Sequence, residues 1–183
     1  DTGFHWQNDH SIRAGLGNFN SFLLAGSFSF GDGVKSNTII NADYLTNKGD
    51  LFAQQYARFG LNVVSVFNTN NNNEWTTKAS YRNVTQYFYG FEPSTLSFKK
   101  EDLLARFNEA GIEVGLRNKK PNAFNITYAP KLILKYFERG IKEYNAILEA
   151  PIRKTFAKKF AIDLGILADI ANTPGISFNN QND

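Results

Sequence analysis

The sequence predicts an all-β protein whose strands form an antiparallel transmembrane β-barrel or a large part of one. The first observation is an alternation of apolar and polar side chains that returns in segments of about ten residues, the length such barrels use. At 160–170 every even position is apolar, and the odd positions include Asp163 and Asp169. The second observation is glycine beside charge on the polar face, and the third is aromatic residues near segment ends. Because a strand turns successive side chains to opposite faces, each segment has one apolar and one polar face.

Turn residues separate the first predicted strands. In chain order these strands span 12–19, 21–30, 38–45, 56–67 and 75–91. Asn18 and Asn20 end the first, and Gly31-Asp32-Gly33 ends the second, because Asn, Asp and Gly adopt the positive φ angles that turns require. The run 46–54 is expected to be a loop. The asparagine run 70–73 is interpreted as a turn in preference to a calcium site, since no carboxylate precedes Glu74.

Further strands follow a long connection at 92–102 and bring the total to about nine. They span 109–117, 124–136, 143–153 and 159–170. The stretches 103–109 and 138–150 also have helical character, but a period of two fits more of their positions. Pro130 cannot donate a backbone hydrogen bond, so a bulge or a register irregularity is expected there. One domain or domain segment is expected over 1–183, with irregular ends at 1–10 and 172–183.

Composition excludes several classes of protein. No run of about 18 apolar residues exists, so a membrane-spanning helix is excluded, whereas alternating strands remain possible. The absence of cysteine excludes disulfides and thiol chemistry. The 20 basic and 17 acidic residues are spread evenly along the chain. A nucleic-acid surface gathers its basic residues, so no nucleic-acid partner is expected.

The alternation alone does not say which face of the sheet is covered. In a soluble sandwich or lipocalin-like barrel the apolar face points inward, whereas in a membrane barrel it faces lipid and the charged residues line the lumen. Gly111 and Gly115 flank Glu113 on the polar face, and small residues suit the crowded inside of a barrel wall. Aromatic residues near strand ends are typical of interfacial girdles. These features favour the membrane barrel.

Opposite charges on the polar face are expected to pair across hairpins. A tight turn would place Lys135 opposite Glu143, and another would place Glu109 opposite Lys131. Such pairs suit a lumen that is filled by salt bridges.

The site residues predicted from these arguments form three groups. The lumen-facing group is Arg58, Lys78, Arg82, Glu109, Glu113, Arg117, Lys131, Lys135, Glu143, Glu149, Arg153 and Asp163. The lipid-facing group is Phe59, Leu61, Val63, Ile112, Val114, Leu116, Leu132, Leu134, Phe160, Ile162, Leu164 and Ile166. The aromatic girdle is Phe28, Phe30, Trp75, Tyr87, Tyr89, Phe91 and Tyr136. The cluster at 87–91 is interpreted as girdle in preference to a ligand platform.

Three sequence runs resemble a known family. They are AGLGNF at 14–19, ADYLTNKG at 42–49 and YRNVTQYFYGF at 81–91. In this order they resemble the G-x-G-N-[YF], H-L-S-S-K-G-like and R-N-V-x-x-Y-Y-G-F segments of Bacteroidetes outer-membrane barrels described as TonB-dependent receptor-like. The resemblance implies that the chain is part of a larger antiparallel barrel around a lumen. No TonB box or plug domain is recognisable, and a final strand with a terminal aromatic residue is expected outside the chain.

No motif indicates catalysis, a metal or a cofactor, and the protein is expected not to be an enzyme. His5, His10, Asp9 and Ser11 are a weak nucleophile constellation, because no predicted strand fixes their relative positions. Glu149 and Asp163 are candidates for paired carboxylates across the last hairpin. Arg153 lies on the same face, however, so a neutralised network is the favoured interpretation.

The expected function is passage or receptor-type uptake of a solute across the outer membrane of a Gram-negative bacterium. The expected partners are outer-membrane lipid and, in a complex, other envelope proteins. One alternative is a structural or assembly subunit of an envelope complex with a plugged lumen. Another is a soluble β-barrel that binds an apolar ligand.

Overall fold

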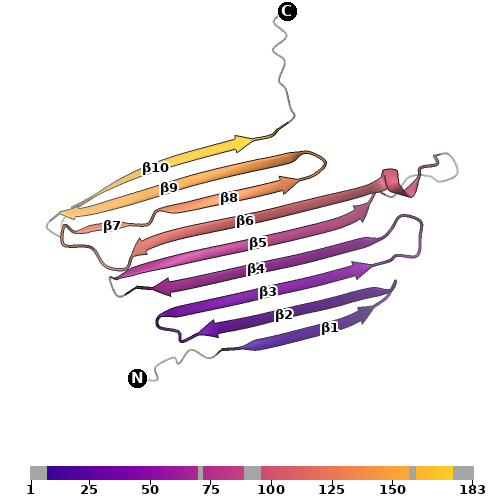
Figure 1. Cartoon of the computed structure of the whole chain (residues 1–183), viewed down its shortest axis with the longest axis horizontal. Coiled ribbons are helices and arrows are strands. Elements are labelled where there is room, and N and C mark those ends of the chain that lie inside the picture. Colours follow the sequence, from indigo (N-terminus) through magenta and orange to yellow (C-terminus); the bar gives the residue numbers. More distant parts are fainter. Residues whose placement is uncertain (1–7, 70–71, 89–95, 157–159, 175–183) are drawn as a thin grey trace, which may run out of the picture.

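The protein is a single antiparallel sheet of ten strands, which confirms the all-β prediction. The computed structural model describes residues 8–69, 72–88, 96–156 and 160–174. The elements are β1 (His10–Gly17), β2 (Ser21–Gly31), β3 (Ser36–Asn47), β4 (Tyr56–Asn68), β5 (Asn73–Tyr87), the 3-10 turn η1 (Lys100–Leu103), β6 (Leu104–Asn118), β7 (Ile126–Tyr128), β8 (Lys131–Glu138), β9 (Lys142–Phe156) and β10 (Phe160–Asn172). Neighbouring strands pair in the order β1-β2-β3-β4-β5-β6-β8-β9-β10, as in a meander, and the short strand β7 pairs with β9 (Figure 1).

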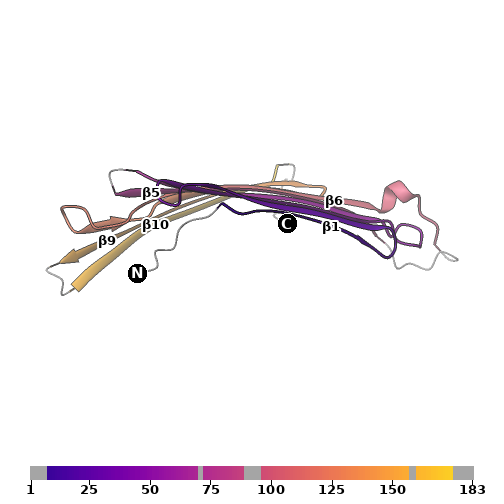
Figure 2. The ribbon, with the colours of Figure 1, turned by 90° about the horizontal axis from the view of Figure 1, so that it is seen from below.

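The sheet is open, so closure into a barrel is not part of this structure. Strands β1 and β10 form its two edges, and their arrows point in the same direction (Figure 1). Seen along its edge, the sheet is one gently curved layer with no second layer packed on it (Figure 2). Both faces are therefore uncovered over the described residues.

The structure has almost no core. Among the described residues only Ala53 and Leu103 are buried apolar residues, and no large side chain is fully buried. Large apolar side chains are instead exposed on the sheet, for example Ile112 at 52% and Leu164 at 70%. No helix in the described part of the chain is long or apolar enough to cross a membrane.

Pro130 interrupts the ladder, as the sequence predicts, and divides the predicted strand 124–136 into β7 and β8. β7 and β8 pair with β9 in the same register, so the pairing with β9 has no bulge. The irregularity is therefore in the pairing with β6, the neighbour on the other side. Leu116 donates its N–H to the Pro130 carbonyl at 2.9 Å, but the proline has no N–H to return. On the β7 side of Pro130, the Asn118 side chain makes the hydrogen bonds to the β7 backbone in place of backbone pairing with β6. It donates to the Ile126 carbonyl and accepts from the Tyr128 N–H, both at 2.8 Å.

Other strand limits differ from the prediction at their ends. The strand expected at 75–91 ends at Tyr87, and residues 89–91 lie outside the described part. The stretches 103–109 and 138–150, which have helical character in the sequence, belong mainly to β6 and to β8 and β9. Cross-strand pairing on both sides of these stretches outweighs their weak helical periodicity.

Candidate functional site

The strand register divides the side chains into two faces of opposite character. We call the polar face the one that carries Lys78 and Glu113, and the apolar face the one that carries Ala79 and Ile112. All of the residues expected in the lumen lie on the polar face, from Arg58 on β4 to Asp163 on β10. All of the residues expected to face lipid lie on the apolar face. Whether these faces meet a lumen and lipid stays a prediction.

Ion pairs run across the polar face from β3 to β10. They are Arg58–Asp43, Lys78–Glu113 and Lys131–Glu149 at 2.9 Å, Arg117–Glu74 at 2.7 Å and Arg153–Asp163 at 3.7 Å. Except for Arg58–Asp43, which is diagonal, each joins two residues that lie directly opposite in the register. The sequence arguments missed the partners Asp43 and Glu74, although both have the strand parity of the polar face. The five ion pairs neutralise much of this surface.

The particular pairs expected from the sequence are wrong. Lys135 lies opposite Asn145, and Glu143 lies opposite Phe137, because the turn occupies 139–141 and shifts the register. The long connection after β6 places Lys131 opposite Gly115, away from Glu109.

The carboxylates considered for a pair across the last hairpin are also apart. Glu149 lies opposite Leu167, whereas Asp163 lies opposite Arg153 and forms an ion pair with it. The structure therefore agrees with the neutralised network, which was the favoured interpretation.

The apolar face is free of charge across its centre. On its described strands the charged residues are Arg106, Glu138 and Lys142 at one end and Lys154 at the other. Lys142 and Lys154 are twelve residues apart on β9, which is about 40 Å at about 3.4 Å per residue. In a transmembrane barrel, whose strands tilt by about 40°, a segment of this length would span about 30 Å, the thickness of the hydrocarbon core of a bilayer.

Aromatic residues lie toward both ends of this uncharged band. Phe67 and Trp75 are register partners near the end that carries the β2–β3 and β4–β5 connections. Tyr136 and Tyr144 are partners near the opposite end, with ring centroids 5.3 Å apart. The expected girdle residues Phe28, Phe30, Trp75, Tyr87 and Tyr136 all lie on the apolar face, whereas Tyr89 and Phe91 lie outside the described residues.

Glycines occupy crowded positions on the polar face. A Cβ added to Gly60 would meet the Asp43 carboxylate at 2.5 Å, and one added to Gly111 would meet the Ser80 hydroxyl at 3.0 Å. The glycine at 60 therefore leaves the space that the Asp43 side chain needs for its ion pair with Arg58.

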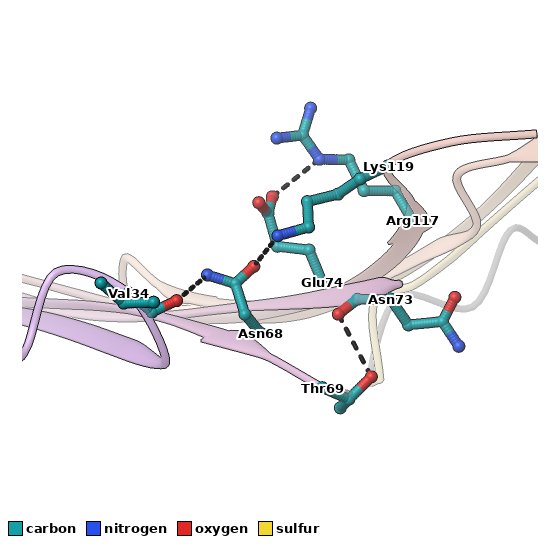
Figure 3. Close-up of polar contacts among 7 residues, drawn as sticks. All are labelled: Val34, Asn68, Thr69, Asn73, Glu74, Arg117 and Lys119. Carbon is teal, nitrogen blue, oxygen red and sulfur yellow. Dashed lines mark hydrogen bonds and ion pairs between the residues drawn. The ribbon is translucent and has the colours of Figure 1, made fainter. Parts of the chain in front are cut away.

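Polar contacts join neighbouring turns at one end of the sheet. Asn68 donates to the Val34 carbonyl at 2.6 Å and accepts from the Lys119 ammonium at 2.9 Å (Figure 3). The Arg117–Glu74 ion pair lies next to these contacts, and the Thr69 hydroxyl donates to the Asn73 carbonyl at 3.2 Å (Figure 3). These contacts tie the ends of β2 through β6 to one another.

The turn at 32–35 is held by a single carboxylate. Asp32 accepts the N–H groups of Val34, Lys35 and Ser36 at 2.9, 2.6 and 3.0 Å. Hydrogen bonds from the Ser36, Val34 and Lys35 backbone stabilise the charged form and lower the pKa of Asp32 below its ordinary value.

The structure gives no support to a catalytic or metal site in the part that it describes. His10 and Ser11 are consecutive strand residues and point to opposite faces, so these two do not form part of a nucleophile constellation, which the sequence already disfavoured. The His10 ring instead lies 5.4 Å from that of Phe30. His5 lies outside the described residues. No group of three metal-ligating side chains occurs among the residues that were placed.

Comparison with known proteins does not add to these observations. No protein-family model matches the chain, and neither do curated proteins or solved structures.

Proposed function

We propose that this chain forms part of the wall of a bacterial outer-membrane β-barrel that passes or takes up a solute. The observation that carries the proposal is a coreless sheet with an uncharged apolar face on one side and a network of ion pairs on the other. In a bilayer the apolar face is covered by lipid, and the charged face lines an aqueous lumen. The band between Lys142 and Lys154 has the height that this arrangement needs.

Strand directions indicate a larger barrel. The sheet has ten strands, but β7 and β8 lie end to end beside β9 and count as one position in the sheet. The meander therefore has nine strand positions. In a nine-place meander the two edge strands run in the same direction, as β1 and β10 do (Figure 1). Direct closure would make these two strands parallel. Antiparallel closure therefore needs an odd number of additional strands.

The exposed edge strand β10 supports continuation of the wall. Leu164, Ile166, Leu167 and Ile170 are between 66% and 70% exposed, and they include residues of both faces. A long apolar edge with unpaired backbone groups promotes aggregation unless another strand covers it. A neighbouring strand in the barrel would provide this cover.

Connection lengths suggest an orientation. The two longest connections, β3–β4 and β5–β6, lie at one end, whereas the other end carries the short β2–β3 and β4–β5 connections and the seven residues 119–125 between β6 and β7. Outer-membrane barrels have short periplasmic turns and longer outer loops. We therefore place the turn network around Asn68 on the periplasmic side.

Adjacent threonines on β5 provide the test. Thr76 lies on the polar face and Thr77 on the apolar face, and both are half-buried. Because the chain lacks cysteine, Thr76→Cys and Thr77→Cys each give a single labelling site. We expect lipids with a quenching doxyl group to quench a fluorophore at position 77 and to leave one at position 76 bright. The reverse result would place the apolar face inside, and recovery of the protein in buffer without detergent would end the membrane proposal.

The ion pairs also bear on the alternative, a structural subunit with a plugged lumen. A lumen wall with this density of paired charges favours low conductance. In planar bilayers a pore should change its ion selectivity when Glu113→Lys reverses one wall charge. A folded, inserted protein that conducts no ions would instead support the structural role.

A further inference from the structure

One opposed pair of charges on the polar face does not form an ion pair. On the polar face of the described strands, oppositely charged residues lie directly opposite one another at Glu74/Arg117, Lys78/Glu113, Lys131/Glu149, Arg153/Asp163 and Arg82/Glu109. Each of these except the last forms an ion pair within 4.0 Å. Arg82 and Glu109 are both exposed, and their charged groups are available to a ligand.

A hollow of about 570 Å³ lies beside this pair, and we call it the Arg82 hollow. Besides Arg82 and Glu109, its lining includes the charged residue Glu143 and the apolar residues Phe107, Phe137 and Ile141. Its volume is within the range of about 300–1,000 Å³ that is usual for small-molecule sites. A second hollow of about 290 Å³ also borders Arg82 and Glu109 and extends toward Ser80 and Asn62.

Two further charged residues of the lining, Arg139 and Glu138, have contacts within the protein. Arg139 lies over the Phe107 ring at 5.0 Å, and Glu138 accepts a hydrogen bond from Asn108 at 2.9 Å. No ion pair occupies Arg82, Glu109 or Glu143 in the described part of the chain. The lining thus holds two guanidinium groups and three carboxylates beside apolar side chains, and Arg82, Glu109 and Glu143 are the charged residues in it for which no contact within the protein is described.

We infer that the Arg82 hollow binds a zwitterionic solute with an apolar group, such as a short peptide. Arg82 binds the carboxylate of the solute, since a guanidinium is well suited to hold a carboxylate by two hydrogen bonds. Glu109 and Glu143 bind its ammonium group, and Phe107 and Phe137 contact its apolar side chain. A neutral sugar would leave the charges of Arg82, Glu109 and Glu143 without partners, so this surface fits it less well.

The hollow lies near the end of the sheet that carries the long connections, because Phe137 and Glu143 adjoin the turn 139–141. As part of a barrel, this end is the outer mouth of the lumen. The role in uptake rests on the proposed function, but binding to the hollow does not. The site would capture peptides before they pass inward.

Calorimetric titration of the full-length protein in detergent provides the test. The probe is leucyl-leucine, and its N-acetylated, amidated analogue lacks both charges. We expect the dipeptide to bind and the analogue to bind at least about tenfold more weakly, because charged hydrogen bonds are lost. Equal binding of the two compounds to the unchanged protein, or no binding of the dipeptide, would overturn the inference without any need for a variant.

Variants with matched controls locate the site. Arg82→Gln and Glu109→Gln should each weaken dipeptide binding by about tenfold or more. Lys78→Gln and Glu113→Gln make the same changes of charge on the same two strands and the same face, but outside the Arg82 hollow, and should leave binding unchanged. An equal loss in all four variants would show a general charge effect and refute the site.

The two proposals fail separately. If the dipeptide binds but the labels at positions 76 and 77 show no lipid contact, the binding site is supported and the membrane barrel is refuted. If lipid quenches the label at position 77 and leaves the one at position 76 bright, but the dipeptide does not bind, the membrane barrel is supported and the binding site is refuted.

Discussion

Ile112 at the centre of the apolar face provides a direct test of the membrane proposal. It lies on β6, is 52% exposed, and has Ala79 and Leu134 as register partners on its two sides. Replacement by arginine places a charge in the middle of the uncharged band. The matched control is Ile133→Arg, the same substitution on the opposite face.

The expected difference between the two variants is large. An arginine on the lipid face near the middle of the bilayer costs about 2–4 kcal/mol of folding free energy. At about 3 kcal/mol, Ile112→Arg would reduce the ratio of folded to unfolded protein by more than a hundredfold. Ile133 lies opposite Glu113 and borders a hollow of about 260 Å³ whose charged lining residues are Lys78, Lys135, Glu109 and Glu113, so an arginine there would enter a polar environment of mixed charge. We expect Ile133→Arg to change stability by less than about 1 kcal/mol.

The assay is folding into lipid vesicles as a function of urea, followed by the heat-modifiable migration of the folded protein on gels. Equal destabilisation by the two arginines would show that the faces do not differ in environment. Greater damage by Ile133→Arg would show that the polar face is the buried one. A soluble protein that covers its apolar face internally would show the loss in Ile112→Arg without any lipid present.

Three smaller perturbations test the local structure by urea unfolding. Asp32→Asn should have a lower free energy of unfolding than the unchanged protein at neutral pH. Because the pKa of Asp32 is lowered in the folded state, this difference in free energy should disappear as the pH falls through the folded-state pKa. A difference that does not depend on pH would contradict this. Gly60→Ala should lower the free energy of unfolding by about 1 kcal/mol because the added Cβ would meet the Asp43 carboxylate. In the double variant with Asp43→Ala this clash is absent, so the two effects on the free energy of unfolding should not add. Strict additivity would refute the clash as the cause. Asn118→Ala should lower the free energy of unfolding by about 1–2 kcal/mol, because the Tyr128 N–H loses its acceptor. An unchanged urea concentration at the midpoint of unfolding would show that water replaces the side chain.

The sequence predicted the faces well because strand alternation is a local property. Once a segment is known to be a strand, Glu113 and Ile112 must lie on opposite faces whatever their partners are. Strand register is not local. It depends on turn length, and the placement of the β8–β9 turn at 139–141 is enough to put Lys135 opposite Asn145 instead of Glu143. Nor does alternation contain information on how the sheet closes, which depends on strands at its two edges.

A comparison of energies shows what fixes the register of this coreless sheet. A one-residue slip of β6 would break the Lys78–Glu113 and Arg117–Glu74 ion pairs, which are partly exposed and worth at most about 1 kcal/mol each. The same slip would also turn Glu109, Glu113 and Arg117 onto the apolar face and Ile112 onto the polar face. In a bilayer each basic residue moved near the midplane costs about 2–4 kcal/mol and each acidic residue somewhat less, for a total of several kcal/mol. We therefore expect lipid to specify the register more strongly than the ion pairs do, and the ion pairs to serve mainly to neutralise the lumen wall.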